Sequence, residues 1–382
     1  MMNKDDWGGA RTAGPLPPRF AYAALAGETG ASAAYTPLPG PDAVMAAMPL
    51  EGSAAALVRQ ARAQVRSVLA GDDDRLLVIT GPCSVHDPMA AVEYAWRLAT
   101  LQDTLEDELL IVMRVYPEKP RTVTGWPGLL TDPEMDGSCD VLRGLEQSRQ
   151  LLLDVACAGL PTACEWLDPV TPWYLADAVA WGAIGARTAE SQVHRNLASA
   201  LPMPVGIKNA THGGVQPAVD ACRSAGVPHV FFGLTPRGTA AVVRSAGNQD
   251  CHVILRGGDS GPNYAAGQVS LALDMISGAG LPRRVMVDAS HGNSGKDHRR
   301  QPEVAAAVAA QVAAGENGII GIMLESFLRA GRQEPGPAAS LEYGMSVTDA
   351  CMDFGTTATA LRVLAEAARQ RRFSVTPAAA LA

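Results

Sequence analysis

The stretch RVMVDASHGNSGKDHRRQPEVAAAVAAQVAAGENGIIGIMLE, residues 284–325, contains the unit from which the fold is predicted. It begins with an apolar run at 284–290 and ends with another at 319–325, and neither run alternates with polar residues as a half-exposed strand does. Between them, residues 302–314 have a helical pattern, with Pro302 in the first turn and Gly315 at the stop. A strand, a helix and a second strand in this order predict parallel strands that are covered on both faces.

The same kind of apolar run recurs along the chain. In order, the runs are LLVIT (76–80), LLIVMRVY (109–116), PTACEWL (161–167), AIGARTA (183–189), PVGIKN (204–209), CHVILRG (251–257), RVMVDAS (284–290) and IIGIMLE (319–325). Helical patterns separate most of them, and a series of strand–helix units of this length is typical of a closed (β/α)₈ TIM barrel, the α/β fold that we predict. A doubly wound open sheet is the alternative, because periodicity alone does not exclude it.

The remaining segments define the predicted domain organisation. Residues 1–50 are rich in Gly, Pro and Ala and predict a partly irregular N-terminal arm, residues 51–372 a single catalytic barrel, and residues 373–382 a tail. Within the barrel, HVFFGL at 229–234 is followed by PRG and a second apolar run. This pattern predicts a β-hairpin over 229–247, inserted before the sixth barrel strand.

Composition and charge exclude several classes of protein. The 382 residues are 47% hydrophobic and 18% charged, as in soluble globular proteins. The net charge of −8 argues against nucleic acid as a partner, and no apolar run approaches the roughly 20 residues that span a bilayer. The N-terminus lacks signal-peptide order, and the seven cysteines show no disulfide framework. We therefore expect a cytoplasmic protein that binds neither nucleic acid nor a membrane.

A polar residue stands at or just beyond the end of every predicted strand. Barrel active sites are built at the carboxyl ends of the strands, so these chain-distant residues should converge on one cavity. One polar residue after one apolar run would usually mark the beginning of solvent, but an unbroken series favours a site. The residues are Cys83, Arg114, Glu165, Arg187, Lys208, Arg256, His291 and Glu325.

Two subsets of these and neighbouring residues point to particular chemistry. Many cations in one cleft predict a substrate that carries carboxylate and phosphate groups. They are Arg114, Lys119, Arg121, Arg187, Lys208 and Arg256. Thiolate, imidazole and carboxylate donors could bind one divalent metal ion, whether Mn, Fe, Co or Zn, although none stands at ligand spacing to another. They are Cys83, His291, Glu325 and Asp349.

Six strings closely resemble the type I, bacterial-type 3-deoxy-D-arabino-heptulosonate 7-phosphate (DAHP) synthases. They are GPCSVHDP (81–88), MRVYPEKPRT (113–122), WGAIGARTAESQVHR (181–195), HVILRGG (252–258), DASHGNSGKDHRRQ (288–301) and YGMSVTDAC (343–351). The resemblance covers about residues 50–370, in order and with similar spacing. It implies a transferase that condenses phosphoenolpyruvate with erythrose 4-phosphate in a metal-dependent, aldol-type reaction. The reaction releases phosphate and is the first step of the shikimate pathway to the aromatic amino acids.

By position, the resemblance also implies the role of each site residue. The metal ligands would be Cys83, His291, Glu325 and Asp349, and the phosphoenolpyruvate site would contain Arg114, Lys119, Glu165, Arg187, Lys208 and Arg256. Arg121 and Thr122 would bind the aldose phosphate, and Lys119, Cys83 and His291 would be catalytic. Among so many cations we expect a depressed pKa for Lys119, which would suit it to proton transfer.

One departure from the family leaves the aldose open. KNATHGG at 208–214 stands where the family usually reads KNGTDG, so Ala210 and His212 are unusual beside the anion site. An alternative is therefore a paralogue of specialised metabolism that takes a different aldose phosphate or amino-aldose phosphate. A non-catalytic, effector-binding barrel is a third interpretation, but the presence of every proposed ligand counts against it.

The resemblance further implies an effector and an assembly. Family members are often inhibited by one aromatic amino acid, in a cleft between the N-terminal arm and the inserted hairpin. Here that cleft would include Pro172, Leu201 and Gly233. Gly233 in FFGL, together with HGNSGKDHRRQP, looks more like the tyrosine-sensitive branch than the phenylalanine-sensitive one. Members are commonly oligomeric, so we expect a homodimer or homotetramer.

Overall fold

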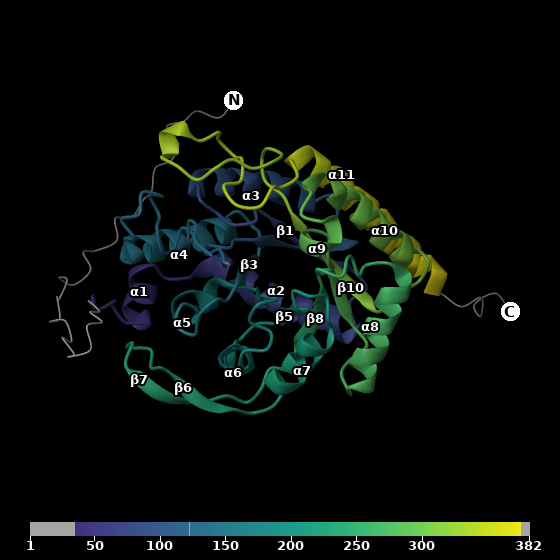
Figure 1. Cartoon of the computed structure of the whole chain (residues 1–382), viewed down its shortest axis with the longest axis horizontal. Helices are drawn as coiled ribbons and strands as arrows, with labels where there is room; N and C mark the ends of the chain where they lie inside the picture. The colour runs from purple at the N-terminus through teal and green to yellow at the C-terminus, as the bar shows by residue number, and fades with distance from the viewer. Residues whose placement is uncertain (1–34, 122, 376–382) are drawn as a thin grey trace.

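The computed structural model describes residues 35–121 and 123–375. Its parallel strands close into a barrel in the order β1-β10-β9-β8-β5-β4-β3-β2 (Figure 1). The barrel strands are β1 (Leu76–Gly81), β2 (Leu109–Arg114), β3 (Thr162–Glu165), β4 (Trp181–Ile184), β5 (Val205–Lys208), β8 (Cys251–Leu255), β9 (Val285–Asp288) and β10 (Ile319–Glu325). Because β1 pairs with both β2 and β10, the sheet has no free edge. The predicted TIM barrel is confirmed, and the open-sheet alternative is wrong.

The barrel strands are buried on both faces, which explains their continuous apolar runs. Every residue of β1 is buried. Leu77 and Ile79 belong to a cluster inside the barrel that also contains Met286 and Met323, whereas Val78 packs in the outer layer under the helices. Side chains therefore fill the barrel interior, and the chemistry must lie at one of its ends.

Helices surround the strands and close one mouth of the barrel (Figure 1). They are α1 (Pro41–Ala47), α2 (Gly52–Ala70), α3 (Pro88–Gln102), α4 (Val141–Cys157), α5 (Pro172–Leu175), α6 (Gln192–Ala200), α7 (Gln216–Ala225), α8 (Ala266–Gly278), α9 (His291–Ser294), α10 (Gln301–Ala313) and α11 (Phe354–Val375). Val65 and Val68 of α2 belong to the interior cluster with Leu77 and Ile320, near the beginning of their strands. Since α2 covers this amino-terminal mouth, the carboxyl-terminal mouth is the one left to build a site.

The predicted hairpin lies outside the ring, between α7 and β8 (Figure 1). Its strands, β6 (Val230–Leu234) and β7 (Ala240–Arg244), are antiparallel. Phe232 is 91% exposed, whereas its neighbours Phe231 and Gly233 are half-buried, so one face turns outward and the other turns to the barrel. The backbone N–H of Asp42, in α1, donates to Pro236 O at 2.8 Å, which joins the N-terminal arm to the hairpin turn.

One predicted strand boundary is wrong, and two helices reach into the segments predicted as an arm and a tail. β4 ends at Ile184 rather than continuing over 183–189, because the next residues form a turn in which Thr188 N donates to Gly185 O at 3.1 Å. The arm contains the regular helix α1, and α11 continues to Val375, into the predicted tail. Residues 1–34 of the arm lie outside the described residues. In the part of the chain that the structure describes, no helix combines the length and apolarity needed to cross a bilayer.

Candidate active site

The residues predicted at strand ends all lie at the carboxyl-terminal end of the barrel. Arg114, Glu165, Lys208 and Glu325 are the last residues of β2, β3, β5 and β10. Cys83, Arg187, Arg256 and His291 follow β1, β4, β8 and β9 within three residues. The barrel topology therefore brings residues from all eight strands to one end.

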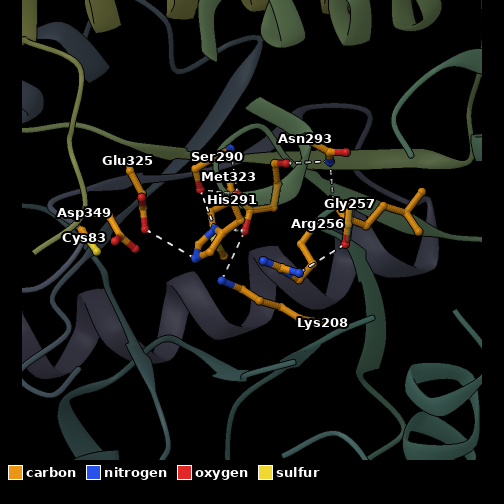
Figure 2. Close-up of polar contacts among 12 residues, drawn as sticks. Cys83, Lys208, Arg256, Gly257, Ser290, His291, Asn293, Met323, Glu325 and Asp349 are labelled. Atoms are coloured by element: carbon orange, nitrogen blue, oxygen red, sulfur yellow. Dashed lines mark hydrogen bonds and ion pairs between the residues drawn. The ribbon is translucent and has the colours of Figure 1, made fainter. Parts of the chain in front are cut away.

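Three of the proposed metal ligands form one cluster. The Sγ of Cys83 and carboxylate oxygens of Glu325 and Asp349 lie within 4.8 Å of one another. His291 is adjacent, with its Nε2 3.8 Å from Glu325 Oε1, and Figure 2 shows its ring directed toward that carboxylate. A buried thiol, two acids and an imidazole are donors that suit a divalent transition metal, so the residues fit a cation.

Lys119 compensates part of the negative charge of this cluster. Its Nζ donates to Cys83 Sγ at 2.9 Å and to Asp349 Oδ2 at 2.8 Å. Burial lowers the pKa of Lys119, but the charges of Cys83, Asp349 and Glu325 outweigh burial and hold that pKa above its ordinary value. The predicted depression of the pKa is therefore wrong, because the groups nearest the ammonium are anions rather than the other cations of the site.

The same contacts keep Asp349 ionised. Burial alone would raise the pKa of Asp349, but the charge and hydrogen bond of Lys119 hold it well below its usual range. Burial and the charge of Glu325 raise the pKa of Cys83 to about 11. Without a metal ion, a thiol in these surroundings stays protonated. A metal cation bound beside it would favour the thiolate form.

Asp288, the last residue of β9, orients His291. His291 Nδ1 is hydrogen-bonded to Ser290 Oγ at 2.7 Å and lies 2.9 Å from Asp288 Oδ2, so the other ring nitrogen, Nε2, faces the cluster. Ser290 Oγ donates to Asp288 Oδ1 at 2.5 Å. A carboxylate behind a histidine fixes the ring and its tautomer, as in many metal sites. The sequence analysis missed this role, although an aspartate within an otherwise apolar strand could have signalled it.

Two buried cations flank the cluster. Arg114 is 1% exposed, and its Nη2 lies 3.3 Å from Glu325 Oε1. Lys208 is 3% exposed, and its Nζ lies 3.2 Å from Asp288 Oδ2. Both lysine and arginine therefore border the space next to the candidate metal ligands.

A buried amide fixes the backbone of Glu325. Gln301 Nε2 donates to Glu325 O at 3.0 Å, and Glu325 N donates to Gln301 Oε1 at 2.8 Å. This pair holds the end of β10 against the start of α10. The sequence analysis missed the role of Gln301, which stands directly before the helix predicted over 302–314.

Three further residues, Arg121, Thr122 and Glu165, were also predicted to belong to the site. Arg121 Nε donates to Trp126 O at 2.8 Å, within the loop after β2, and Thr122 lies outside the described residues. Glu165 is 9% exposed at the end of β3. Among the residues that the structure describes, no hydrogen bond or ion pair joins Arg121 or Glu165 to Cys83, Glu325 or Asp349.

Of the three predicted effector residues, Gly233 belongs to strand β6 of the hairpin, Pro172 to α5, and Leu201 directly follows α6. A Cβ placed on Gly233 would lie 3.7 Å from the ring of Trp173, the residue after Pro172. Pro172 is buried in α5, and Leu201, directly after α6, is 8% exposed. The inner face of the hairpin thus covers α5. Leu201 O instead accepts a hydrogen bond at 3.4 Å from Asn248, in the segment that follows the hairpin in the chain.

Comparison with known proteins places this arrangement in one family. The model of the DAHP synthetase I family matches residues 54–362. A phospho-2-dehydro-3-deoxyheptonate aldolase of Corynebacterium glutamicum is 51% identical over 346 residues, covering 89% of this chain and 94% of that protein. The Phe-sensitive phospho-2-dehydro-3-deoxyheptonate aldolase of Escherichia coli is 52% identical over 332 residues, covering 87% and 95%.

A solved structure agrees with the sequence comparisons. The phospho-2-dehydro-3-deoxyheptonate aldolase of Francisella tularensis superimposes with a TM-score of 0.86 at 46% identity, covering 88% of this chain and 98% of that one. The fold and the matched length agree, and the chain belongs to the DAHP synthetase I family.

Proposed function

We propose that this chain is a 3-deoxy-7-phosphoheptulonate synthase. It condenses phosphoenolpyruvate with erythrose 4-phosphate and releases phosphate, as the first step of the shikimate pathway. The observation that carries the proposal is the cluster of Cys83, Glu325 and Asp349 within 4.8 Å, bordered by buried cations. Its position at the carboxyl end of the barrel and membership of the DAHP synthetase I family support it.

The metal site would consist of Cys83, His291, Glu325 and Asp349. A bound divalent cation (Mn, Fe, Co or Zn) supplies Lewis-acid chemistry that makes an aldehyde carbon electrophilic. Asp288 and Gln301 position two of the ligands, through the His291 ring and the Glu325 backbone. Their role is to hold donor atoms in place without contacting substrate.

The phosphoenolpyruvate site would be built by the cations Arg114, Lys119, Arg187, Lys208 and Arg256, with Glu165 beside them. Guanidinium and ammonium groups bind carboxylate and phosphate, and the anion in turn relieves the repulsion among the cations. Held there, carbon 3 of phosphoenolpyruvate attacks the aldehyde carbon. Water then adds at carbon 2, and phosphate leaves by cleavage of its C–O bond. Much of the acceleration comes from holding two anionic reactants together.

Lys119 enters this scheme as a cation. Since its pKa is raised, it stays protonated and can donate a proton or bind an anion, whereas a base would need the neutral amine. Its contacts with Cys83 and Asp349 place the ammonium directly beside the proposed metal ligands.

The aldose site would contain Arg121 and Thr122, which would bind the phosphate of erythrose 4-phosphate. A paralogue that takes another aldose phosphate or an amino-aldose phosphate is the second candidate, and KNATHGG favours it. Ala210 is buried two residues after Lys208, whereas His212 is exposed in the loop that follows. The two substitutions therefore change the loop that follows one of the proposed anion-binding residues.

We further propose an aromatic amino acid as effector, with tyrosine favoured, bound near Pro172, Leu201 and Gly233. We also propose a homodimer or homotetramer. Phe232 and Val242 are 91% and 61% exposed on the outer face of the hairpin, and apolar side chains of this size favour contact with another copy. A cytoplasmic location is in keeping with seven free cysteines.

One assay tests the proposed reaction. The purified chain is incubated with phosphoenolpyruvate, erythrose 4-phosphate and Mn²⁺, and phosphate release is followed with and without a chelator. We expect release that the chelator abolishes and added metal restores. Undiminished release in chelator would contradict the metal site. Release with an amino-aldose phosphate alone would favour the paralogue, and none with any aldose phosphate would favour an effector-binding barrel.

A further inference from the structure

We propose that the opposite end of the barrel carries a second anion-binding site, between Arg284 and Arg371, that takes a small oxyanion of the phosphate class. The cavity there has a volume of about 510 Å³. Its lining comes from the end of α2, the residues before β1, β9 and β10, and the last turns of α11. Its charged residues are Asp73, Asp74, Arg75, Arg284, Arg371 and Arg372. These segments lie at the amino-terminal mouth, away from the candidate active site.

The cavity has an excess of positive charge. Four arginines and two aspartates line it. Each aspartate already has an arginine of its own: Asp73 Oδ2 lies 2.6 Å from Arg75 Nη2, and Asp74 Oδ1 lies 2.7 Å from Arg372 Nη2. The lining acids are therefore occupied in these two ion pairs, and the charges of the other two arginines remain to be balanced.

Arg284 and Arg371 have only backbone carbonyls as their described partners. Arg371, 7% exposed, donates to Ile319 O at 3.2 Å and to Asp74 O at 2.6 Å. Arg284 Nη1 donates to Asn317 O at 2.9 Å. Among the residues that the structure describes, neither guanidinium has a carboxylate within 4.0 Å. A carbonyl satisfies a donor without cancelling a charge. Without a counter-ion the buried charge of Arg371 is therefore unfavourable, and the partly buried Arg284 adds a second positive charge beside it.

The two guanidinium groups are close enough to affect each other. Burial lowers the pKa of Arg371; Asp74 opposes this, while the charges of Arg284 and Arg372 add to it. Gly71 makes room for Arg284, because a Cβ at that position would overlap the Nη2 of Arg284. Gly71 also has a φ of +87°, which favours glycine. The glycine therefore both ends α2 in a left-handed conformation and leaves space for the Arg284 side chain.

The ligand class follows from these groups. Two guanidinium groups present several N–H donors in planar forks, which match the oxygens of phosphate or sulfate better than a single halide ion. Arg284 also lines a neighbouring cavity of about 190 Å³ with apolar walls that include Leu69, Ile276 and Leu281. The bound group could therefore be free phosphate or the phosphate of a small ester whose carbon part enters that neighbouring cavity.

Equilibrium dialysis with radiolabelled inorganic phosphate tests the site. We expect the wild-type chain to bind phosphate at the candidate active site and at this second site. Arg284→Gln should lose one equivalent, with affinity at that site reduced at least tenfold, and keep its phosphate-releasing activity within about twofold. Arg283→Gln is the matched control, because Arg283 pairs with Glu316 at 3.3 Å on the surface and does not line the cavity.

A folded Arg284→Gln variant that binds as many equivalents as wild type would overturn the proposal. Should that variant not fold, Arg284→Lys decides: it keeps the charge but loses the planar fork, and unchanged affinity would count against the site. Glycerol phosphate, run beside inorganic phosphate, identifies which source binds more tightly. The readout is the number of bound equivalents, so it can be obtained even if the proposed reaction fails.

Discussion

Cys83 has the surroundings of a metal ligand rather than of a structural thiol. Its Sγ accepts a hydrogen bond from Lys119 at 2.9 Å and lies within 4.8 Å of Glu325 and Asp349 oxygens. We predict that Cys83→Ala lowers turnover more than about 100-fold, because one donor is lost from the cation site. Phosphate release and bound metal per chain are the measurements, and thermal unfolding shows whether the variant is folded.

The control for this substitution is Cys157→Ala, since Cys157 is exposed at the end of α4. It should leave turnover and metal content unchanged. Wild-type turnover in Cys83→Ala would show that the thiol is not a ligand.

Asp288 gives a second prediction, since it acts only through His291 and Lys208. Asp288→Asn should weaken metal affinity by about 10- to 100-fold, because the His291 ring loses the carboxylate that orients Nε2 toward the cluster. Metal titration into the apoprotein measures this. Asp297→Asn, in the loop after α9, is the matched control, because Asp297 is paired with Arg299 instead. Equal affinity in wild type and Asp288→Asn would remove the positioning role.

At the residue scale, the sequence predicted which side chains share the site better than it predicted their states. The positions of Cys83, Glu325 and His291 follow from strand ends and barrel topology, which the apolar runs reveal. The raised pKa of Lys119 depends on which charges lie within a few ångströms, and the sequence contains no such distances. Asp288 and Gln301 escaped notice for the same reason, because each acts through a neighbour that only the fold supplies.

At the element scale, the N-terminal arm joins the hairpin to α5. Tyr174 Oη of α5 donates to Pro39 O at 2.9 Å, and Asp42 N donates to Pro236 O at 2.8 Å. A ligand under the hairpin would therefore contact elements that are tied to the arm. This connection is the physical basis for expecting an effector to act there.

Gly233→Val tests that role of the hairpin. The added side chain must displace Val243, whose Cγ2 would lie 2.6 Å from a Cβ at this position, and fill space next to Trp173. We predict weaker inhibition by tyrosine, by at least tenfold in the inhibitory concentration, with uninhibited turnover unchanged. Titrations of tyrosine and phenylalanine against phosphate release measure it.

Gly267→Ala on α8 is the control for the hairpin variant, because nothing lies within 4 Å of the added carbon. It should retain wild-type inhibition. Unaltered tyrosine inhibition in Gly233→Val would place the effector elsewhere, and stronger inhibition by phenylalanine in the wild type would contradict the tyrosine assignment.

The elements themselves were predictable where a pattern is long and unbroken. The apolar runs at 251–257 and 319–325 correspond to β8 and β10 because both faces of these strands are buried. Boundaries were less predictable. The run AIGARTA is interrupted beyond Ile184 only by Arg187 and Thr188, yet the chain already turns at Gly185. The helix α1 is too short to produce a recognisable helical period.

At the scale of the whole molecule, the barrel interior contains a histidine that should make stability depend on pH. His252 of β8 is 5% exposed and accepts a hydrogen bond from Trp181 Nε1 at 3.3 Å. Burial lowers its pKa to about 4, so the unfolded chain binds a proton near pH 6.5 that the folded chain does not. The free energy of unfolding should therefore fall as pH drops from about 6.5 to 4.

The protonation of His252 should lower the free energy of unfolding by about 3 kcal/mol once the pH is below 4, since each unit of pKa shift corresponds to about 1.4 kcal/mol. His252→Gln should be less stable at neutral pH but show a shallower loss between pH 6.5 and 4. Urea unfolding at a series of pH values measures both slopes. Parallel slopes in the two proteins would show that His252 is protonated equally in the folded and unfolded chains.

The two ends of the barrel also differ in kind. At the carboxyl end, residues from eight strands bring candidate metal ligands and cationic side chains together. At the amino end, α2 covers the barrel, and its last residues line the arginine-rich cavity. The central claim concerns the first of these ends: one divalent cation, held by residues from four separate parts of the chain, next to the cations that hold phosphoenolpyruvate.

Anomalous diffraction from wild-type crystals soaked in Mn²⁺ tests that claim most directly. We predict one strong peak about 2–2.5 Å from Cys83 Sγ, His291 Nε2 and carboxylate oxygens of Glu325 and Asp349. A peak elsewhere in the barrel, or none at these residues in crystals of protein that is active with Mn²⁺, would contradict the account.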